Sequence, residues 1–450
     1  MDHQNMPSWE PHPDAEALVT ELLDEVLARS SKARAFADDL VRSCGVRLRD
    51  LIDHVLVPRD WAQRFEDAGW ERVEPGVRRH QGGRFPAVLD GNRDIELAVR
   101  VESVATFVEA QGLDVQVVGE AHSPYRFADV FRGGGVLISV VERNGFPGFD
   151  ISAVGADTIR AARVHQQALR TRRRQFAHPL EGFDYTERLV QAAIDDIGQH
   201  WTCDLFLRAE REYWMARCDA GRIQKERQDV AGIGWSNIDH HTYDASRQYF
   251  DRSIKLLEML GYECRELFYA GHHAGWGSQI LEQPVIGSTI FADIDLAPHE
   301  LDFDFAHTVL DPLEKHRRAG LWCAMHGESM LEAGLNHVAG LYDQQALRHQ
   351  LHGLGIAMMK PFSDLPYLYQ ELTAGQWLPV DPDHVDSLER SGHLDKQEAE
   401  SFRLRGAIGC HLENIERNDG FKGFNQPGID GVLRVIDPRQ TIDDAVPAAG

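Results

Sequence analysis

The sequence predicts an α+β protein in which a β-α-β-β-β unit occurs twice. In the first unit, a helix expected over 100–111 ends at Gly112 and is followed by short apolar runs that are typical of strands. In the second unit, a helix expected over 246–260 ends at Gly261 and precedes extended runs that continue to residue 328. The same order in both halves favours two modules whose curved sheets surround one cavity, with helices added before, between and after them.

Five regions follow from these patterns. Leu18, Leu22 and Val26 recur at helical spacing near the N-terminus, which indicates that the chain begins with helices. We expect a helical N-terminal segment over 1–70, a first module over 71–152, a helical insertion over 153–230, a second module over 231–340 and a helical or loop-like C-terminal region with a tail over 341–450.

Composition limits the classes of partner. The 450 residues carry a formal net charge of −24, so nucleic acids and anionic membranes are not expected, because phosphates are held by basic surfaces. No apolar run approaches the ~18 residues that a membrane span requires. Six scattered cysteines, without a C-x-x-C pair or a secretory signal, predict free thiols in the cytoplasm. Small molecules are the expected partners, and a homo-oligomer is left open.

Three short stretches carry most of the metal-binding chemistry. His80 begins His-Gln-Gly-Gly-Arg, His240 lies in Ile-Asp-His-His-Thr, and Glu328 ends His-Gly-Glu after an apolar run that we expect to be a strand. Two imidazoles and one carboxylate on one face of an ion form a facial set that leaves coordination positions open. We therefore predict His80, His240 and Glu328 as metal ligands.

Each predicted ligand also has an ordinary structural interpretation. A lone His such as His80 is more often a surface or hydrogen-bonded residue. His240 and His241 are adjacent, so only one of them can face a cavity from a strand, and which one stays open. Glu328 needs a cation or a donor to offset desolvation. His326 would share a strand face with Glu328, either as a donor beside the metal ligands, as a substitute ligand, or as simple packing.

These stretches resemble the 2-oxoadipate dioxygenase/decarboxylase family, also called hydroxyglutarate synthase, of the vicinal-oxygen-chelate superfamily. Its His-x-x-x-Arg, Ile-Asn-His-x-Thr and Gly-Glu motifs are similar to the stretches that contain His80 with Arg84, His240, and Glu328. The residues after the Gly-Glu pair depart from the family pattern. The resemblance covers about residues 75–385 and includes weaker similarities at His122-Ser123-Pro124-Tyr125-Arg126, Ile280–Gln283 and Trp377–Val380.

The resemblance implies vicinal-oxygen-chelate-like modules and a non-haem Fe(II) enzyme, with another divalent metal left open. Such an enzyme uses dioxygen to convert a 2-oxo acid, such as 2-oxoadipate, to a shortened 2-hydroxy acid with loss of carbon dioxide. It consumes no separate 2-oxoglutarate. The implied catalytic residues are Arg84, Gln283 and His326, and the implied substrate contacts are Arg84, His122, Ser123, Arg126 and Val380.

Alternatives remain at the level of residues and of function. Arg84 suits either a substrate carboxylate or an ion pair with one of the many acidic residues, and Gln283 suits either the metal site or the backbone. The same fold hosts metal-dependent lyases, isomerases and extradiol-type dioxygenases. A small-molecule binding protein without turnover is the non-enzymatic alternative.

Overall fold

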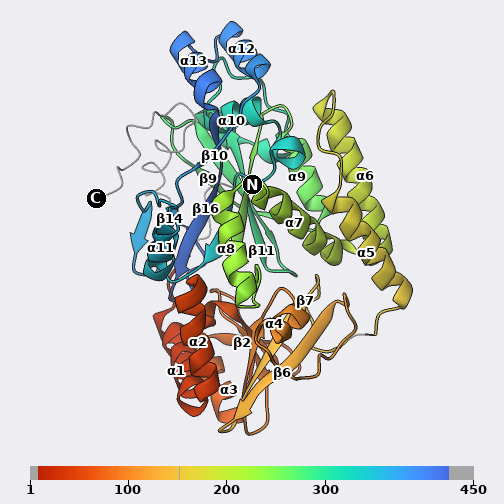
Figure 1. The fold of residues 1–450 in the computed structure, drawn as a ribbon, viewed down its shortest axis with the longest axis vertical. Helices are drawn as coiled ribbons and strands as arrows, with labels where there is room; N and C mark the ends of the chain where they lie inside the picture. Colours follow the sequence, from red (N-terminus) through yellow and green to blue (C-terminus); the bar gives the residue numbers. More distant parts are fainter. Residues whose placement is uncertain (1–8, 152, 425–450) are drawn as a thin grey trace.

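The computed structural model describes residues 9–151 and 153–424, and within them the chain forms two β-sheets flanked by helices (Figure 1). The N-terminal sheet has the strand order β2-β3-β4-β1-β5-β7-β6. Its strands are β1 (Ile52–Val57), β2 (Trp70–Glu74), β3 (Val77–His80), β4 (Ala87–Asp90), β5 (Ile95–Arg100), β6 (Tyr125–Gly133) and β7 (Val136–Arg143).

The C-terminal sheet has the order β13-β14-β16-β12-β8-β11-β10-β9, and β15 pairs with β16 outside this path. Its long central strands are buried on both faces, as expected for a sheet covered on both sides. The strands are β8 (Ile238–Ala245), β9 (Glu263–Tyr269), β10 (Trp276–Gln283), β11 (Ser288–Asp295), β12 (His337–Leu341), β13 (Ser363–Leu365), β14 (Leu368–Leu372), β15 (Gln376–Leu378) and β16 (Ala407–Arg417).

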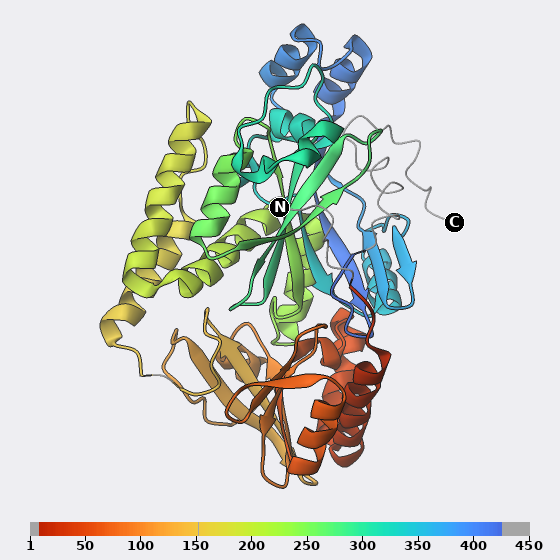
Figure 2. The same ribbon diagram turned by 180° about the vertical axis from the view of Figure 1, so that it is seen from behind.

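Helices cover both sheets and connect them (Figures 1 and 2). None of the helices in the described residues is long and apolar enough to cross a membrane. The helices are α1 (Pro13–Arg29), α2 (Ser31–Cys44), α3 (Arg59–Asp67), α4 (Val104–Ala110), α5 (Ala156–Arg170), α6 (Pro179–Ile197), α7 (Gln199–Met215), α8 (Asp219–Val230), α9 (Phe250–Met259), α10 (Arg318–His326), α11 (Gln344–Gly353), α12 (Pro382–Arg390) and α13 (Lys396–Arg405).

Each sheet consists of two β-α-β-β-β units, so the described residues contain four of them. Within each unit the first and last strands pair in parallel: β1 with β4, β5 with β7, β8 with β11, and β12 with β16. The first strands of the two units then pair antiparallel, β1 with β5 and β8 with β12. The predicted α+β class and its repeated module are confirmed, and each predicted module lies in a different sheet.

The second and fourth units are modified copies of the pattern. In the second, the strand after α4 is reduced to an isolated bridge between Val118 and Phe127. In the fourth, β15, α12 and α13 are inserted between β14 and β16. This insertion delays the last strand of the unit until Ala407, far along the chain from β12.

Three expectations about individual elements are corrected. The apolar run at 321–326 belongs to helix α10 rather than a strand, because a short buried apolar run has no periodicity that separates the two. Strand β1 lies inside the segment 1–70 that was expected to be helical. The region 341–450 contributes β13–β16 to the C-terminal sheet, and its tail from residue 425 lies outside the described residues.

Candidate metal centre

The register of three central strands brings two histidines and one glutamate onto one face of the C-terminal sheet. Ala339 on β12 lies opposite His240 on β8 and opposite Glu413 on β16, so the three form a row across the sheet. His337 is two residues from Ala339 on β12, so its side chain emerges on the same face. Ala339 projects only a methyl group, which leaves space between the flanking side chains.

The side-chain atoms of His240, His337 and Glu413 lie within 4.8 Å of one another and form a group that could hold a metal ion. Nε2 of His240 is 3.1 Å from Oε2 of Glu413, and Nε2 of His337 is 3.2 Å from the same oxygen. His240 and Glu413 are buried, and His337 is half-buried. Two imidazoles and one carboxylate are the donor set of a facial triad.

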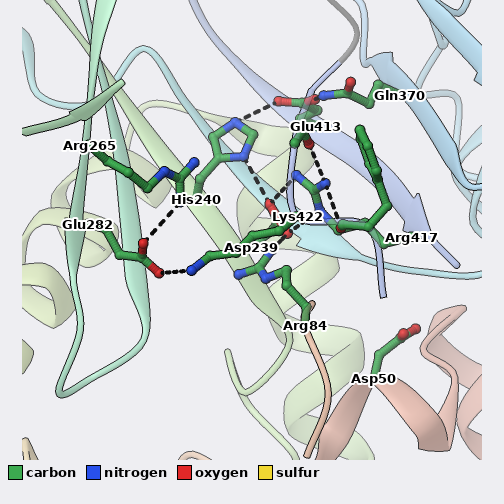
Figure 3. A network of polar contacts seen from close by, with 12 residues as sticks. Asp50, Arg84, Asp239, His240, Arg265, Glu282, Gln370, Glu413, Arg417 and Lys422 are labelled. Carbon is green, nitrogen blue, oxygen red and sulfur yellow. Dashed lines mark hydrogen bonds and ion pairs between the residues drawn. The ribbon is translucent and has the colours of Figure 1, made fainter. Parts of the chain in front are cut away.

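A second polar side chain orients each of the three residues, and Figure 3 shows the partners of His240 and Glu413. Nδ1 of His240 is 3.2 Å from Oδ2 of Asp239, and Nδ1 of His337 is 3.0 Å from Oδ1 of Asn336. Both oxygens accept from Nδ1, so with a metal bound each ring would carry its one proton on Nδ1 and offer Nε2 to the ion. Nε2 of His337 also lies 2.8 Å from Oγ1 of Thr242. Gln370 completes the set by donating to Oε1 of Glu413 over 3.0 Å.

Asp239 is in turn fixed by two arginines. Arg417 donates to it through Nε over 2.8 Å and through Nη2 over 3.1 Å, and Arg84 pairs with the same carboxylate (Figure 3). A paired fork of this kind holds a carboxylate in one orientation. The position of the His240 ring therefore depends on residues from both sheets, because Arg84 follows β3 and Arg417 ends β16.

The electrostatics of the group favour a cation. Burial opposes a charge on His240, but Glu413 and Asp239 outweigh it and raise the pKa of this imidazole to about 9. Burial raises the pKa of the Glu413 carboxyl, and His240 more than reverses this, so the value falls to about 2. Burial lowers the pKa of His337. Two carboxylates thus require positive charge beside His240, a requirement that a metal ion also meets.

A cavity opens directly onto the group. Its walls include the aromatic side chains Phe268, Trp276, Phe291 and Phe424, together with the charged pair Arg318 and Asp293. Among the described residues, Ser278 Oγ and Trp276 Nε1 are buried in this wall without a hydrogen-bond partner. Buried polar atoms in native structures almost always have partners, so these two are available to bond a water or a polar ligand in the cavity.

The alternation of β8 decides between the two adjacent histidines. His240 faces the metal group, whereas His241 lies on the opposite face, where its Nε2 accepts from Nη1 of Arg211 over 3.2 Å. Burial, with the nearby Arg211 charge, lowers the pKa of His241 well below its usual value, so this ring stays neutral. His240 is the candidate ligand.

The structure does not bring the other two predicted ligands to His240. His80 ends β3 in an aromatic cluster, with its ring centroid 4.9 Å from that of Trp70 and 4.8 Å from that of Phe85. Glu328 follows α10, and its Oε2 accepts from the backbone N–H of Ser246 over 3.2 Å. Burial raises its pKa to about 7. The candidate ligand group in the structure therefore consists of His240, His337 and Glu413, and it includes neither His80 nor Glu328.

The residues expected to be catalytic also lie outside the metal cavity. Arg84 forms the ion pair with Asp239, which is the structural alternative that the sequence left open. Gln283 accepts from the backbone N–H groups of Val285 and Ile286 and donates to His200, so it fixes the turn after β10. His326 ends α10 rather than a strand, and its Nε2 contacts the Ile408 carbonyl at 3.1 Å.

The remaining expected substrate contacts have structural partners. Ser123 donates to the carbonyl of Tyr125 over 3.0 Å, and Arg126 pairs with Glu142 at 3.0 Å. His122 has a positive φ of 66° in the turn before β6. Val380 packs on a small apolar cluster beside α10. None of these four residues lines the cavity at the metal group.

Sequence reasoning missed His337 and Glu413. A repeated dipeptide offered one signal: Asp239-His240 and Asn336-His337 each place a short acceptor before a histidine in a strand that leads to a helix. Glu413 gave no local signal, because it lies in a strand that follows two inserted helices and in a region expected to lack strands.

Comparisons with known proteins assign no family. No family model matches the sequence, and no curated protein matches it. Solved structures with some likeness include a mutant 4-hydroxymandelate synthase from Streptomyces coelicolor, with 11% identity over 75% of this chain and 96% of that chain, at a TM-score of 0.29. A methylmalonyl-CoA epimerase from Mycobacterium tuberculosis has 12% identity over 40% of this chain and 88% of that chain, at a TM-score of 0.22.

A third solved structure is described as a glyoxalase superfamily protein from Ralstonia eutropha JMP134. It has 12% identity over 59% of this chain and 97% of that chain, at a TM-score of 0.32. Likenesses of this size leave the family and the activity of the chain unassigned.

Proposed function

We propose that the protein is a non-haem Fe(II)-dependent dioxygenase/decarboxylase that acts on a 2-oxo acid similar to 2-oxoadipate. The observation that carries the proposal is the buried group of His240, His337 and Glu413 at the end of a cavity. The Ile-Asp-His-His-Thr stretch around His240 resembles the Ile-Asn-His-x-Thr motif of the dioxygenase/decarboxylase family. This resemblance supports the same reaction class, because His240 belongs to the candidate metal group although His80 and Glu328 do not.

The residues present fit a divalent metal. His240 and His337 would bind it through Nε2 and Glu413 through Oε2, because these are the atoms that face one another while the outer atoms of the rings and carboxylate are engaged. Bound Fe(II) would supply oxidative chemistry and would keep coordination positions open for a 2-oxo acid and dioxygen. Asp239, Asn336 and Gln370 would hold the ligands in place.

Arg318 is the candidate residue for the substrate carboxylate in the metal cavity. Its Nη1 is 2.9 Å from Asp293 and 3.0 Å from Asp244, and its guanidinium carbon lies 4.6 Å from the centroid of the Trp276 ring. Both ion pairs use the same nitrogen, so the rest of the planar fork can receive a carboxylate. The unpaired Trp276 Nε1 and Ser278 Oγ would donate to other oxygens of the same acid.

The aromatic wall would exclude water from the reacting groups. The ring of Phe424 contacts those of Phe268 and Phe291, with centroids 5.5 and 5.8 Å apart, and all three residues line the cavity. The ring of Phe291 also lies 4.5 Å from that of His240. Exclusion of water strengthens the attraction between Arg318 and a carboxylate, and it protects reactive species from hydrolysis.

The test begins with protein purified without oxygen and reconstituted with Fe(II). We expect about one iron per chain, followed by oxygen uptake and carbon dioxide release with a panel of 2-oxo acids headed by 2-oxoadipate. His337→Ala and Glu413→Ala should each lose the iron, whereas His80→Ala and Glu328→Ala should retain it. The four variants therefore distinguish the structural ligand set from the one that the sequence predicted.

Arg318→Gln tests the substrate position separately. Loss of a charged hydrogen bond predicts an apparent KM raised about 10-fold or more with iron content unchanged. The control is Arg348→Gln, which removes a half-exposed arginine of α11. This arginine pairs with Glu371 of β14 in the C-terminal sheet, and its loss should leave KM unchanged. Iron bound without oxygen uptake would favour a lyase or isomerase, and a chain without stoichiometric metal would contradict the proposal.

A further inference from the structure

A second cavity lies on the face of β8 opposite the metal group. Asp239 and His241 flank His240 in the sequence, and both line this cavity rather than the metal cavity. The opposite wall comes from the N-terminal sheet, through Arg100 at the end of β5 and Arg143 at the end of β7, and from α7, through Arg208 and Arg211. We call the space between these four arginines the arginine cavity.

Two of the four arginines already have carboxylate partners. Arg143 forms two hydrogen bonds with Asp53, over 2.7 and 2.8 Å. Arg208 donates to Asp204 over 2.8 Å. These two positive charges are therefore neutralised within the protein.

The other two arginines have no carboxylate within ion-pair distance among the described residues. Asp53 and Asp204 attract Arg100, and Glu102 and Asp204 attract Arg211, but these carboxylates already pair with Arg143, Arg208 and Lys225. Among the described residues, the half-exposed Arg100 side chain forms no hydrogen bond or ion pair. Arg211 is 8% exposed, its recorded side-chain contact is the neutral His241, and its Nε is buried without a partner. Burial lowers the pKa of both guanidinium groups. A buried guanidinium without a carboxylate in direct contact is costly, because desolvation of the charge is only partly repaid.

The cavity has room for more than water. Its volume is about 70 Å³, whereas one water needs only about 10–15 Å³ of such space. It adjoins a larger cavity of about 390 Å³, and both are lined by Arg100, Arg143 and Ser236. The charged residues of the larger cavity are Arg49, Arg79, Arg84, Arg100, Arg143, Arg417 and Lys422 against Glu16, Asp50, Asp53 and Glu282.

This basic excess stands out in a chain with a net charge of −24. Arginine forks match the planar or tetrahedral oxygens of carboxylates and phosphates. We propose that the arginine cavity binds the oxyanion head of a small organic acid or organic phosphate, between Arg100 and Arg211, with the rest of the ligand in the larger cavity. This site is separate from the metal cavity, and it does not depend on which reaction the metal performs.

The test is calorimetric titration of the full-length protein with two probes, inorganic phosphate and tricarballylate, at constant ionic strength. We expect saturable one-to-one binding of at least one probe. Arg100→Gln should weaken that binding at least about 10-fold, because a charge-assisted hydrogen bond is lost. A response to phosphate alone would identify an organic phosphate as the ligand class, and a response to tricarballylate alone would identify a polycarboxylate.

Two controls separate site binding from general charge effects. Arg132→Gln removes an exposed arginine of the same sheet, paired with Asp129 at 3.0 Å, and should change binding less than about twofold. Arg100→Lys retains the charge without the fork, so its binding should lie between wild type and Arg100→Gln. Thermal melting confirms that each variant is folded. Absence of saturable binding, or equal weakening by Arg100→Gln and Arg132→Gln, would overturn the proposal.

Discussion

The two sheets carry the same arrangement of residues at their centres, and only one of them has the side chains of a metal site. In the C-terminal sheet, the register aligns His240, Ala339 and Glu413 across three strands. In the N-terminal sheet, the register aligns His54, Ala98 and Ser139 across β1, β5 and β7. A histidine and a central alanine thus occupy equivalent places in both.

The supporting residues are equivalent too. An aspartate precedes each histidine and contacts its Nδ1, at 2.7 Å for Asp53 and 3.2 Å for Asp239. Each aspartate is held by two nitrogens of an arginine on the last strand, which is Arg143 in β7 and Arg417 in β16. The two halves therefore share a scaffold that positions one imidazole.

The difference lies in the other two positions. The place of His337 is taken by Glu96, since each lies two residues before the central alanine, and the place of Glu413 is taken by Ser139. Ser139 donates to Glu96 over 3.1 Å, so the N-terminal row is closed by a hydrogen bond. Among the described residues, no metal-binding group includes His54. The fold supplies the positions, and the side chains at two of them decide whether a candidate metal-binding group is present.

The largest expected effect separates Glu413 from its counterpart Ser139. Glu413→Ala removes a ligand, so we expect iron content near zero and oxygen uptake reduced at least ~100-fold. Ser139→Ala should leave both unchanged, because its hydroxyl contacts only Glu96. Elemental analysis and oxygen-electrode measurements on the two variants check this. An equal loss of iron and of oxygen uptake in both variants would contradict the proposed difference between the two sheets.

The aspartates provide the second test. Asp239→Asn should weaken iron binding by roughly 10–100-fold, since it disturbs the residue that orients the His240 ring. Asp53→Asn breaks the equivalent contacts around His54, and should lower Tm while iron affinity stays at the wild-type value. Iron titrations and melting curves on both variants give the two readouts. A change in iron affinity for Asp53→Asn would show that the sheets are coupled.

A gain of function would sharpen the comparison further. The double variant Glu96→His with Ser139→Glu places the C-terminal set onto the N-terminal scaffold. We expect a second, weaker metal equivalent, because the shared aspartate and arginine are present but the surrounding cavity is not built for it. Equilibrium dialysis with Fe(II) or Co(II) counts the sites. Retention of a single equivalent in a folded double variant would show that further residues are required.

The smallest effect concerns Glu328, a buried carboxylate outside both rows. Burial raises its pKa to about 7 from the ordinary value of 4.5, so the folded state holds this proton more tightly than the unfolded state. Its contribution to stability is therefore full below about pH 4.5 and is lost as the pH rises through 7. At pH 8, Glu328→Gln should increase the free energy of unfolding by about 1–3 kcal/mol relative to wild type, and at pH 5 it should change it little. Melting curves at the two pH values check this, because Tm should rise only at pH 8.

The sequence predicted the repeated unit and one member of the candidate metal group, and the reasons for the misses are physical. Element order reveals β-α-β-β-β units because helix and strand periodicities differ, as the helix α9 and strands β9–β11 illustrate. His240 was found because its neighbours form a recognisable motif. His337 and Glu413 become its neighbours only through strand register, which no local pattern encodes. Glu328 attracted attention because it is a carboxylate after an apolar run, yet that run is a helix.

The late position of β16 has a consequence for biosynthesis. The strands of the N-terminal sheet are all complete by Arg143, so that sheet can form while the ribosome is still translating the rest of the chain. The candidate metal group cannot form until Glu413 has been translated. Glu413 follows the inserted helices α12 and α13 and lies close to the end of the described residues. A nascent chain therefore exposes His240 and His337 without Glu413, so the complete candidate metal group forms only after almost all of the described residues have been translated.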